Sequence, residues 1–100
     1  MLKILIVDEK DQRRLVLGGQ LIAPWAAELK SSCERARADL NGRGLILDIR
    51  NLSLISQEGE NTLIELMKEG VSFHCSGVFA KHVVREIAHR ARVQLQEVSS

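Results

Sequence analysis

The order of apolar and polar positions predicts strands and helices that alternate along most of the chain. Residues 2–8 (LKILIVD) and 14–19 (RLVLGG) are rich in strand-forming side chains, and a charged turn separates them. Together they predict a β-hairpin. The nearly apolar run from Leu45 to Ile49 predicts a strand buried on both faces, in a sheet covered by helices. A loop from Arg50 to Gln57 is expected to follow it.

Three further segments have the apolar spacing of amphipathic helices. They cover residues 24–39, 58–69 and 78–92. Their apolar stripes are Trp25, Leu29, Cys33, Ala36 and Leu40 in the first, Leu63, Ile64, Leu66 and Met67 in the second, and Phe79, Val83, Ile87 and Ala91 in the third. Residues 71–75 alternate as a strand does, and the alternation of residues 93–98 also fits a short edge strand. The pattern predicts one α/β domain over residues 1–100, with a mixed sheet of four or five strands and three helices.

Composition narrows the classes of function. The chain has 100 residues, of which 45% are apolar, and a net charge of +1. A charge this close to neutral gives no general attraction to nucleic acid, and three aromatic residues make a base-stacking platform improbable. No apolar run is long enough to cross a bilayer, and the amino terminus has the pattern of a strand and not of a signal peptide. We therefore expect a cytoplasmic protein that binds neither nucleic acid nor membrane directly.

Three places along this order of elements resemble the STAS domain, found in anti-sigma-factor antagonists and in the cytoplasmic tails of sulphate transporters. They are the turn LVLGGQL before the first helix, the strand LDI at residues 47–49, and the loop ISQEG at residues 55–59. The resemblance covers nearly the whole chain. It implies a non-enzymatic domain without a cofactor, which binds an anti-sigma factor or a serine-kinase-type regulator through the loop before the second helix.

The loop departs from the family pattern at its central position. In the family, a partner kinase phosphorylates the Ser or Thr that follows an Asp. Aligned on Gly59, this chain has Ser56 in place of the Asp and Gln57 in place of the phosphorylated residue. Because Gln cannot accept a phosphate, either the protein binds without the switch, or Ser56 is the phosphoacceptor. Ser56 also suits a simpler structural role, that of the helix N-cap, with Glu58 and Glu60 as first-turn acids.

The expected partner-binding residues lie in this loop, at the start of the second helix and in one later turn. They are Ser56, Gln57, Glu58, Gly59, Asn61, Ser76 and Gly77. A second possibility within the same fold is the STAS subunit of a lipid-transport ATPase, which also acts by binding.

A different class of protein shares two local patterns with this chain. The first strand and the stretch GLILDIRN look like parts of a response-regulator receiver, with Asp8, Glu9 and Asp48 as an acidic magnesium site and Asp48 as the phosphoacceptor. A receiver needs a helix directly after its first strand, whereas residues 14–19 read as a strand. The simpler interpretation of Asp48 is a strand-end carboxylate that accepts backbone hydrogen bonds.

Other chemistry has weaker support. His74, Cys75, His82 and His89 lack the close ligand spacing of a structural zinc site, so no metal is expected. Cys33 and Cys75 form no CxxC pair and fit reduced core thiols. The sequence contains neither a GxxxxGK phosphate loop nor a GxSxG nucleophile motif, which argues against an enzyme.

Overall fold

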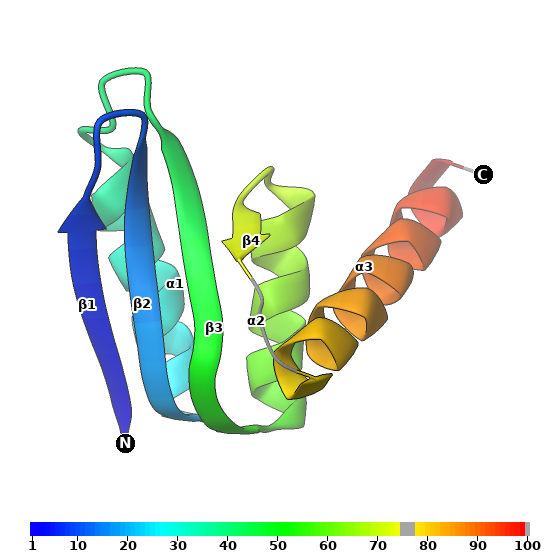
Figure 1. The fold of residues 1–100 in the computed structure, drawn as a ribbon. Coiled ribbons are helices and arrows are strands. Elements are labelled where there is room, and N and C mark those ends of the chain that lie inside the picture. Colours follow the sequence, from blue (N-terminus) through cyan, green and yellow to red (C-terminus); the bar gives the residue numbers. More distant parts are fainter. Residues whose placement is uncertain (75–77, 100) are drawn as a thin grey trace.

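The chain folds around a four-stranded mixed sheet in the order β1-β2-β3-β4 (Figure 1). The computed structural model describes residues 1–74 and 78–99, with side chains placed for residues 1–74 and 81–93. The strands are β1 (Leu2–Asp8), β2 (Gln12–Leu21), β3 (Gly44–Ile55) and β4 (Ser72–His74). The helices are α1 (Trp25–Arg37), α2 (Gln57–Lys68) and α3 (Val78–Ser99). This order confirms the predicted α/β class.

The sheet combines one hairpin with two parallel pairings. β1 runs antiparallel to β2, as the hairpin prediction requires, and seven consecutive residues of β1 pair without a register shift. β3 lies parallel to β2, and β4 lies parallel to β3. Helices α1 and α2 form the crossovers and lie together on one side of the sheet (Figure 1). The ion pairs Lys30–Glu65 and Arg37–Glu69 join these two helices to each other.

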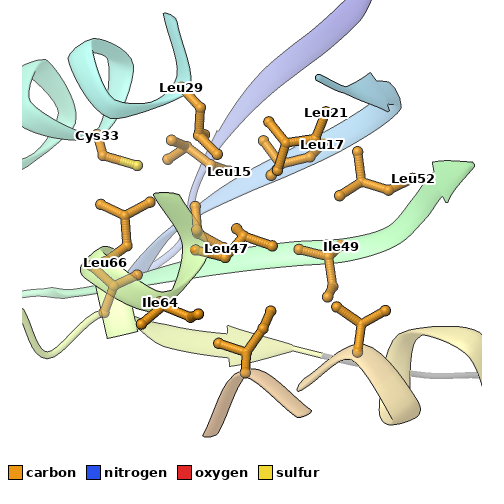
Figure 2. Packing of buried hydrophobic residues seen from close by; sticks show 14 of the residues in the cluster. Leu15, Leu17, Leu21, Leu29, Cys33, Leu47, Ile49, Leu52, Ile64 and Leu66 are labelled. Carbon is orange, nitrogen blue, oxygen red and sulfur yellow. The ribbon is translucent and has the colours of Figure 1, made fainter. Parts of the chain in front are cut away.

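The core lies between the sheet and these helices, and it is almost entirely aliphatic (Figure 2). Leu15 and Leu17 from β2 meet Leu47 and Ile49 from β3, and the helices add their predicted stripes. Leu29, Cys33 and Ala36 of α1, Leu63, Ile64 and Leu66 of α2, and Val83, Ile87 and Ala91 of α3 are all buried. Trp25, Leu40 and Met67 pack against this cluster at its margin. The side chain of Phe79, expected to point inward, lies outside the described residues.

Two expectations about elements were wrong. The expected loop after Ile49 does not exist, because β3 continues to Ile55 and Ser56 alone separates it from α2. Two register shifts between β2 and β3 let this long strand stay paired while it bends. Residues 93–98 belong to α3 and not to an edge strand, because the helix runs on to Ser99. Alternation over six residues was too short to separate the two periods.

Residues on both faces of β3 are buried, as predicted, but helices do not cover both faces. Leu45, Leu47 and Ile49 face the helices, whereas Asp48 belongs to the opposite face by the alternation of the strand. Asp48 is nevertheless fully buried, because Arg14 and Arg50 pair with its carboxylate. On this face the side chains of Arg14 and Arg50 cover the strand at Asp48, whereas helices cover the opposite face.

Candidate functional site

The junction between β3 and α2 is held by the side chain and the backbone of Ser56. Its Oγ accepts a hydrogen bond from the backbone N–H of Gly59 over 3.2 Å, which confirms the N-cap predicted from the sequence. Its own N–H donates to the carbonyl oxygen of Leu21, at 2.9 Å, and its carbonyl accepts from the N–H of Glu60, also at 2.9 Å. Ser56 therefore fixes the start of α2 to the end of β2.

Gly59 is buried and makes the close approach between α2 and β2 possible. A Cβ atom at this position would overlap the carbonyl oxygen of Leu21 and come within 2.9 Å of its Cγ. Only a residue without a side chain fits here. Gly59, expected among the partner-binding residues, thus shapes the surface through packing and does not present a side chain of its own.

The side chains that this junction presents to solvent are polar. Gln57, Glu58 and Asn61 are exposed, and Ser56 is partly exposed. Leu54, two residues before the cap in the sequence, is apolar and 50% exposed. We call Leu54, Gln57, Glu58 and Asn61 the α2-start surface. Leu54 lies in the stretch that the sequence predicted as a loop, and the apolar alternation of β3 continuing past Arg50 is the signal that could have revealed the strand.

Glu60 differs from its exposed neighbours, because it makes an ion pair with Arg90 of α3 at 2.7 Å. Each of these two side chains is 30% exposed, so the pair is partly shielded from water. The contact ties the first turn of α2 to the third helix. Ser76 and Gly77, the remaining expected binding residues, lie outside the described residues.

The three carboxylates of the receiver alternative do not form one acidic cluster. Asp8 pairs with Arg13 at 2.7 Å and with Arg43 at 2.9 Å, and these contacts, chiefly the hydrogen bond from Arg13, hold the pKa of Asp8 below its usual range. The pKa of Glu9 is lowered chiefly by a hydrogen bond from Gln12. Within the described part of the chain, no group of three or more potential ligands could hold a metal ion.

Asp48 has an environment unlike that of a phosphoacceptor. Its carboxylate is fully buried and pairs with Arg14 at 3.3 Å and with Arg50 at 3.1 Å, while the backbone N–H of Arg50 donates to Oδ1 at 3.3 Å. Asp48 also lies within β3 and not at its end, which corrects the strand-end interpretation. A strand, β2, follows β1 directly where a receiver needs a helix. The topology therefore excludes the receiver alternative.

The cysteines and histidines considered as reactive or metal-binding residues do not form a site within the described residues. Cys33 is fully buried in the core, and burial raises the pKa of its thiol to about 11, so it stays protonated and unreactive near neutral pH. His82 and His89 are exposed on α3. Cys75 lies outside the described residues. No helix in the described part of the chain is long and apolar enough to cross a membrane.

The hairpin, the two parallel crossovers and the helix that starts directly after β3 define the STAS-like, or SpoIIAA-like, α/β fold. Solved structures share it at low sequence identity. An anti-sigma factor antagonist from Mycobacterium paratuberculosis superposes with a TM-score of 0.61 and 17% identity, over 73% of this chain and 64% of that one. An uncharacterized protein with a SpoIIAA-like fold from Shewanella loihica gives 0.57 and 17%, over 84% of this chain and 74% of that one.

A third structure, that of Mglu, has a TM-score of 0.56 and 18% identity over 74% of this chain, but only 19% of its own. This chain thus spans less than two thirds of the mycobacterial antagonist and a small part of Mglu. No protein-family model and no curated protein sequence matches the chain. The comparisons establish the fold that the sequence resemblance predicted.

Proposed function

We propose that this protein is a non-enzymatic regulatory domain that binds an anti-sigma factor or a related kinase-fold regulator through the α2-start surface. The observation that carries the proposal is the hydrogen-bonded and closely packed junction beneath that surface. The Ser56 cap and the contact of Gly59 with Leu21 fix the backbone on which Gln57, Glu58 and Asn61 are displayed. A surface ordered before binding loses less entropy when a partner docks.

The chemistry of the surface fits recognition of a protein. Three exposed polar residues, Gln57, Glu58 and Asn61, follow one exposed leucine, Leu54, along the chain, and protein interfaces commonly combine a small apolar contact with polar groups. Glu58 adds a carboxylate in the first turn of α2, where the helix dipole favours it. A partner with a basic or polar groove would match this combination. The fold shared with an anti-sigma factor antagonist adds support for a partner of that kind.

We infer further that binding does not depend on phosphorylation. Gln57, the first residue of α2, has no hydroxyl group. The hydroxyl oxygen of Ser56 is engaged in the cap, and its residue is only partly exposed. A protein kinase would have to open the first turn of α2 to use it. The exposed carboxylate of Glu58 gives this site a fixed negative charge instead.

Affinity capture followed by mass spectrometry tests the proposal. The immobilised protein should enrich a kinase-fold regulator or ATPase from a lysate of its own source, and the Glu58→Arg variant should lose it. Glu28→Arg is the matched control, because Glu28 is also an exposed first-turn glutamate, on α1. Recovery of no such partner, or equal recovery by the Glu58→Arg variant, would contradict the proposal. A phosphopeptide containing phospho-Ser56, formed when the partner and ATP are added, would overturn its unswitched form.

A further inference from the structure

The outer edge of β1 is open and apolar. β1 lies at one end of the sheet (Figure 1), and no strand within the described residues pairs with its outer side. Two of its large apolar side chains are unusually exposed, Leu5 at 62% and Ile6 at 50%. Edge strands are normally protected by shortness, bulges, proline or several charges. β4, the other edge, has only three residues, whereas β1 has seven, no bulge and no proline.

The backbone hydrogen-bonding groups of β1 point alternately toward β2 and away from it, and two hydrogen bonds at the ends of the strand show which residues face β2. The carbonyl oxygen of Met1 accepts from Gln20 N–H, and the N–H of Glu9 donates to the carbonyl oxygen of Gln12. In an antiparallel ladder, alternate residues direct both backbone groups toward the partner strand. Odd-numbered residues therefore bond to β2. The N–H and C=O groups of Leu2, Ile4, Ile6 and Asp8 point outward and are available to a new strand.

We propose that a second copy of this chain adds its β1 to this edge, antiparallel and about a two-fold axis at Leu5. This register pairs Ile4 with Ile6 of the second copy, and Leu2 with Asp8, so that all outward backbone groups of β1 gain partners. The two copies of Leu5 lie side by side at the axis. Lys3 comes opposite Val7, so no like charges are opposed directly. The product is one continuous sheet made of both copies.

A groove beside β1 favours this occupant. It lies between β1 and α1, has a volume of about 450 Å³ and is lined by Leu2, Ile4, Ile6 and Trp25, with Glu28 and Arg35 at its polar side. In the proposed register, Ile4 and Ile6 of the second copy stand next to Ile6 and Ile4 on the face of the sheet that lines the groove. The added strand extends the apolar floor of the groove with side chains of the same kind. The α2-start surface takes no part, so this inference is independent of the proposed function.

Sedimentation equilibrium over concentrations up to about 1 mM tests the association, since that range covers even weak dimers. The weight-average mass should rise from 11.2 kDa toward twice that value. The Leu5→Lys variant should stay at the monomer mass, because it places two ammonium groups at the axis. Leu54→Lys is the control, since it removes another exposed leucine from β3 and should associate as the wild type does. Circular dichroism should show that both variants are folded.

A cysteine pair tests the register itself. In non-hydrogen-bonded antiparallel pairs the Cα atoms are about 4.5 Å apart, which suits a disulfide. Leu5→Cys should therefore form a disulfide-linked dimer under mild oxidation. Lys3→Cys should not, because its two copies would be roughly 13 Å apart. The native cysteines are present in both variants, so any cross-link through them appears in both. A wild-type protein that stays monomeric throughout, a Leu5→Lys variant that still dimerises, or cross-linking equal in the two cysteine variants would each overturn the proposal.

Discussion

The Oγ of Ser56 accepts a hydrogen bond from the backbone N–H of Gly59, and the same glycine packs against the carbonyl oxygen of Leu21. One four-residue turn thus contains both the cap that starts α2 and the contact that seats α2 on the sheet. The residues that carry the proposed binding surface, Gln57 and Glu58, lie between these two fixed points. Their positions are set by a structure that a partner need not induce.

Replacing Ser56 with Ala should destabilise the protein by about 1 kcal/mol, the usual contribution of an N-cap side chain. Ser56→Asp should keep most of the stability, because a carboxylate caps well and is favoured at a helix N-terminus. Urea denaturation followed by circular dichroism measures both. An Ala variant as stable as the wild type would show that the cap hydrogen bond contributes nothing in solution.

Gly59→Ala should destabilise the protein by about 2 kcal/mol, a typical cost of forcing an extra group into a packed site. Helix propensity alone predicts the opposite sign, a gain of about 1 kcal/mol. Asn61→Ala, at an exposed position in the same helix, is the control and should change stability little. Thermal unfolding of the three proteins decides between the two signs, and a more stable Gly59→Ala variant would disprove the close contact.

Asp48→Asn should lower the free energy of unfolding by about 1–3 kcal/mol, because it leaves Arg14 and Arg50 without the buried carboxylate that they share. The loss is smaller than for a fully buried pair, since Arg50 is 47% exposed and can turn toward water. Asp39→Asn should cost less, because that carboxylate is 69% exposed. Equal losses in the two variants would contradict the structural role of Asp48.

Arg13 should make stability depend on pH in the acid range. It hydrogen-bonds to Asp8 and Asp39, and the pKa of each carboxyl is lowered, chiefly by that bond. Because the folded pKa values lie below the unfolded ones, the unfolded chain binds more protons, and this stabilisation is lost as the pH falls below about 4. The Arg13→Gln variant should therefore lose less stability than the wild type between pH 5 and pH 3. If the free energies of unfolding of the two proteins changed with pH in parallel, the stabilising role of the Arg13 contacts with Asp8 and Asp39 would be refuted.

The sequence predicted the elements better than their ends. Alternation and helical spacing identified the hairpin, the three helices and the N-cap at Ser56, because each depends on neighbouring residues. The length of β3 was missed because the polar residues Arg50, Asn51 and Ser53 resemble a loop, although the strand is held there by pairing with β2. Such pairing is a contact between distant segments and leaves little local signal.

In the candidate site, too, the sequence could predict features that depend on neighbouring residues but not those that depend on distant contacts. The cap follows from Ser56 and the acids after it, so the sequence could indicate it. Glycine is required at position 59 because α2 packs there against Leu21, which is thirty-eight positions earlier in the sequence. Only the fold brings these two residues together. The burial of Asp48 likewise depends on Arg14 from another strand. The exposure of Leu54 depends on its place in β3, which the sequence predicted as a loop.

The most direct test of the central claim is a binding titration of the captured partner against the wild type, Glu58→Arg and Glu28→Arg, by calorimetry. We expect the wild type and Glu28→Arg to bind with the same affinity and Glu58→Arg to bind at least about tenfold more weakly, which corresponds to about 1.4 kcal/mol. A charge reversal at a matched contact has that effect because it replaces attraction with repulsion. Equal affinities for all three proteins would show that the partner binds elsewhere, and would contradict the assignment of the α2-start surface.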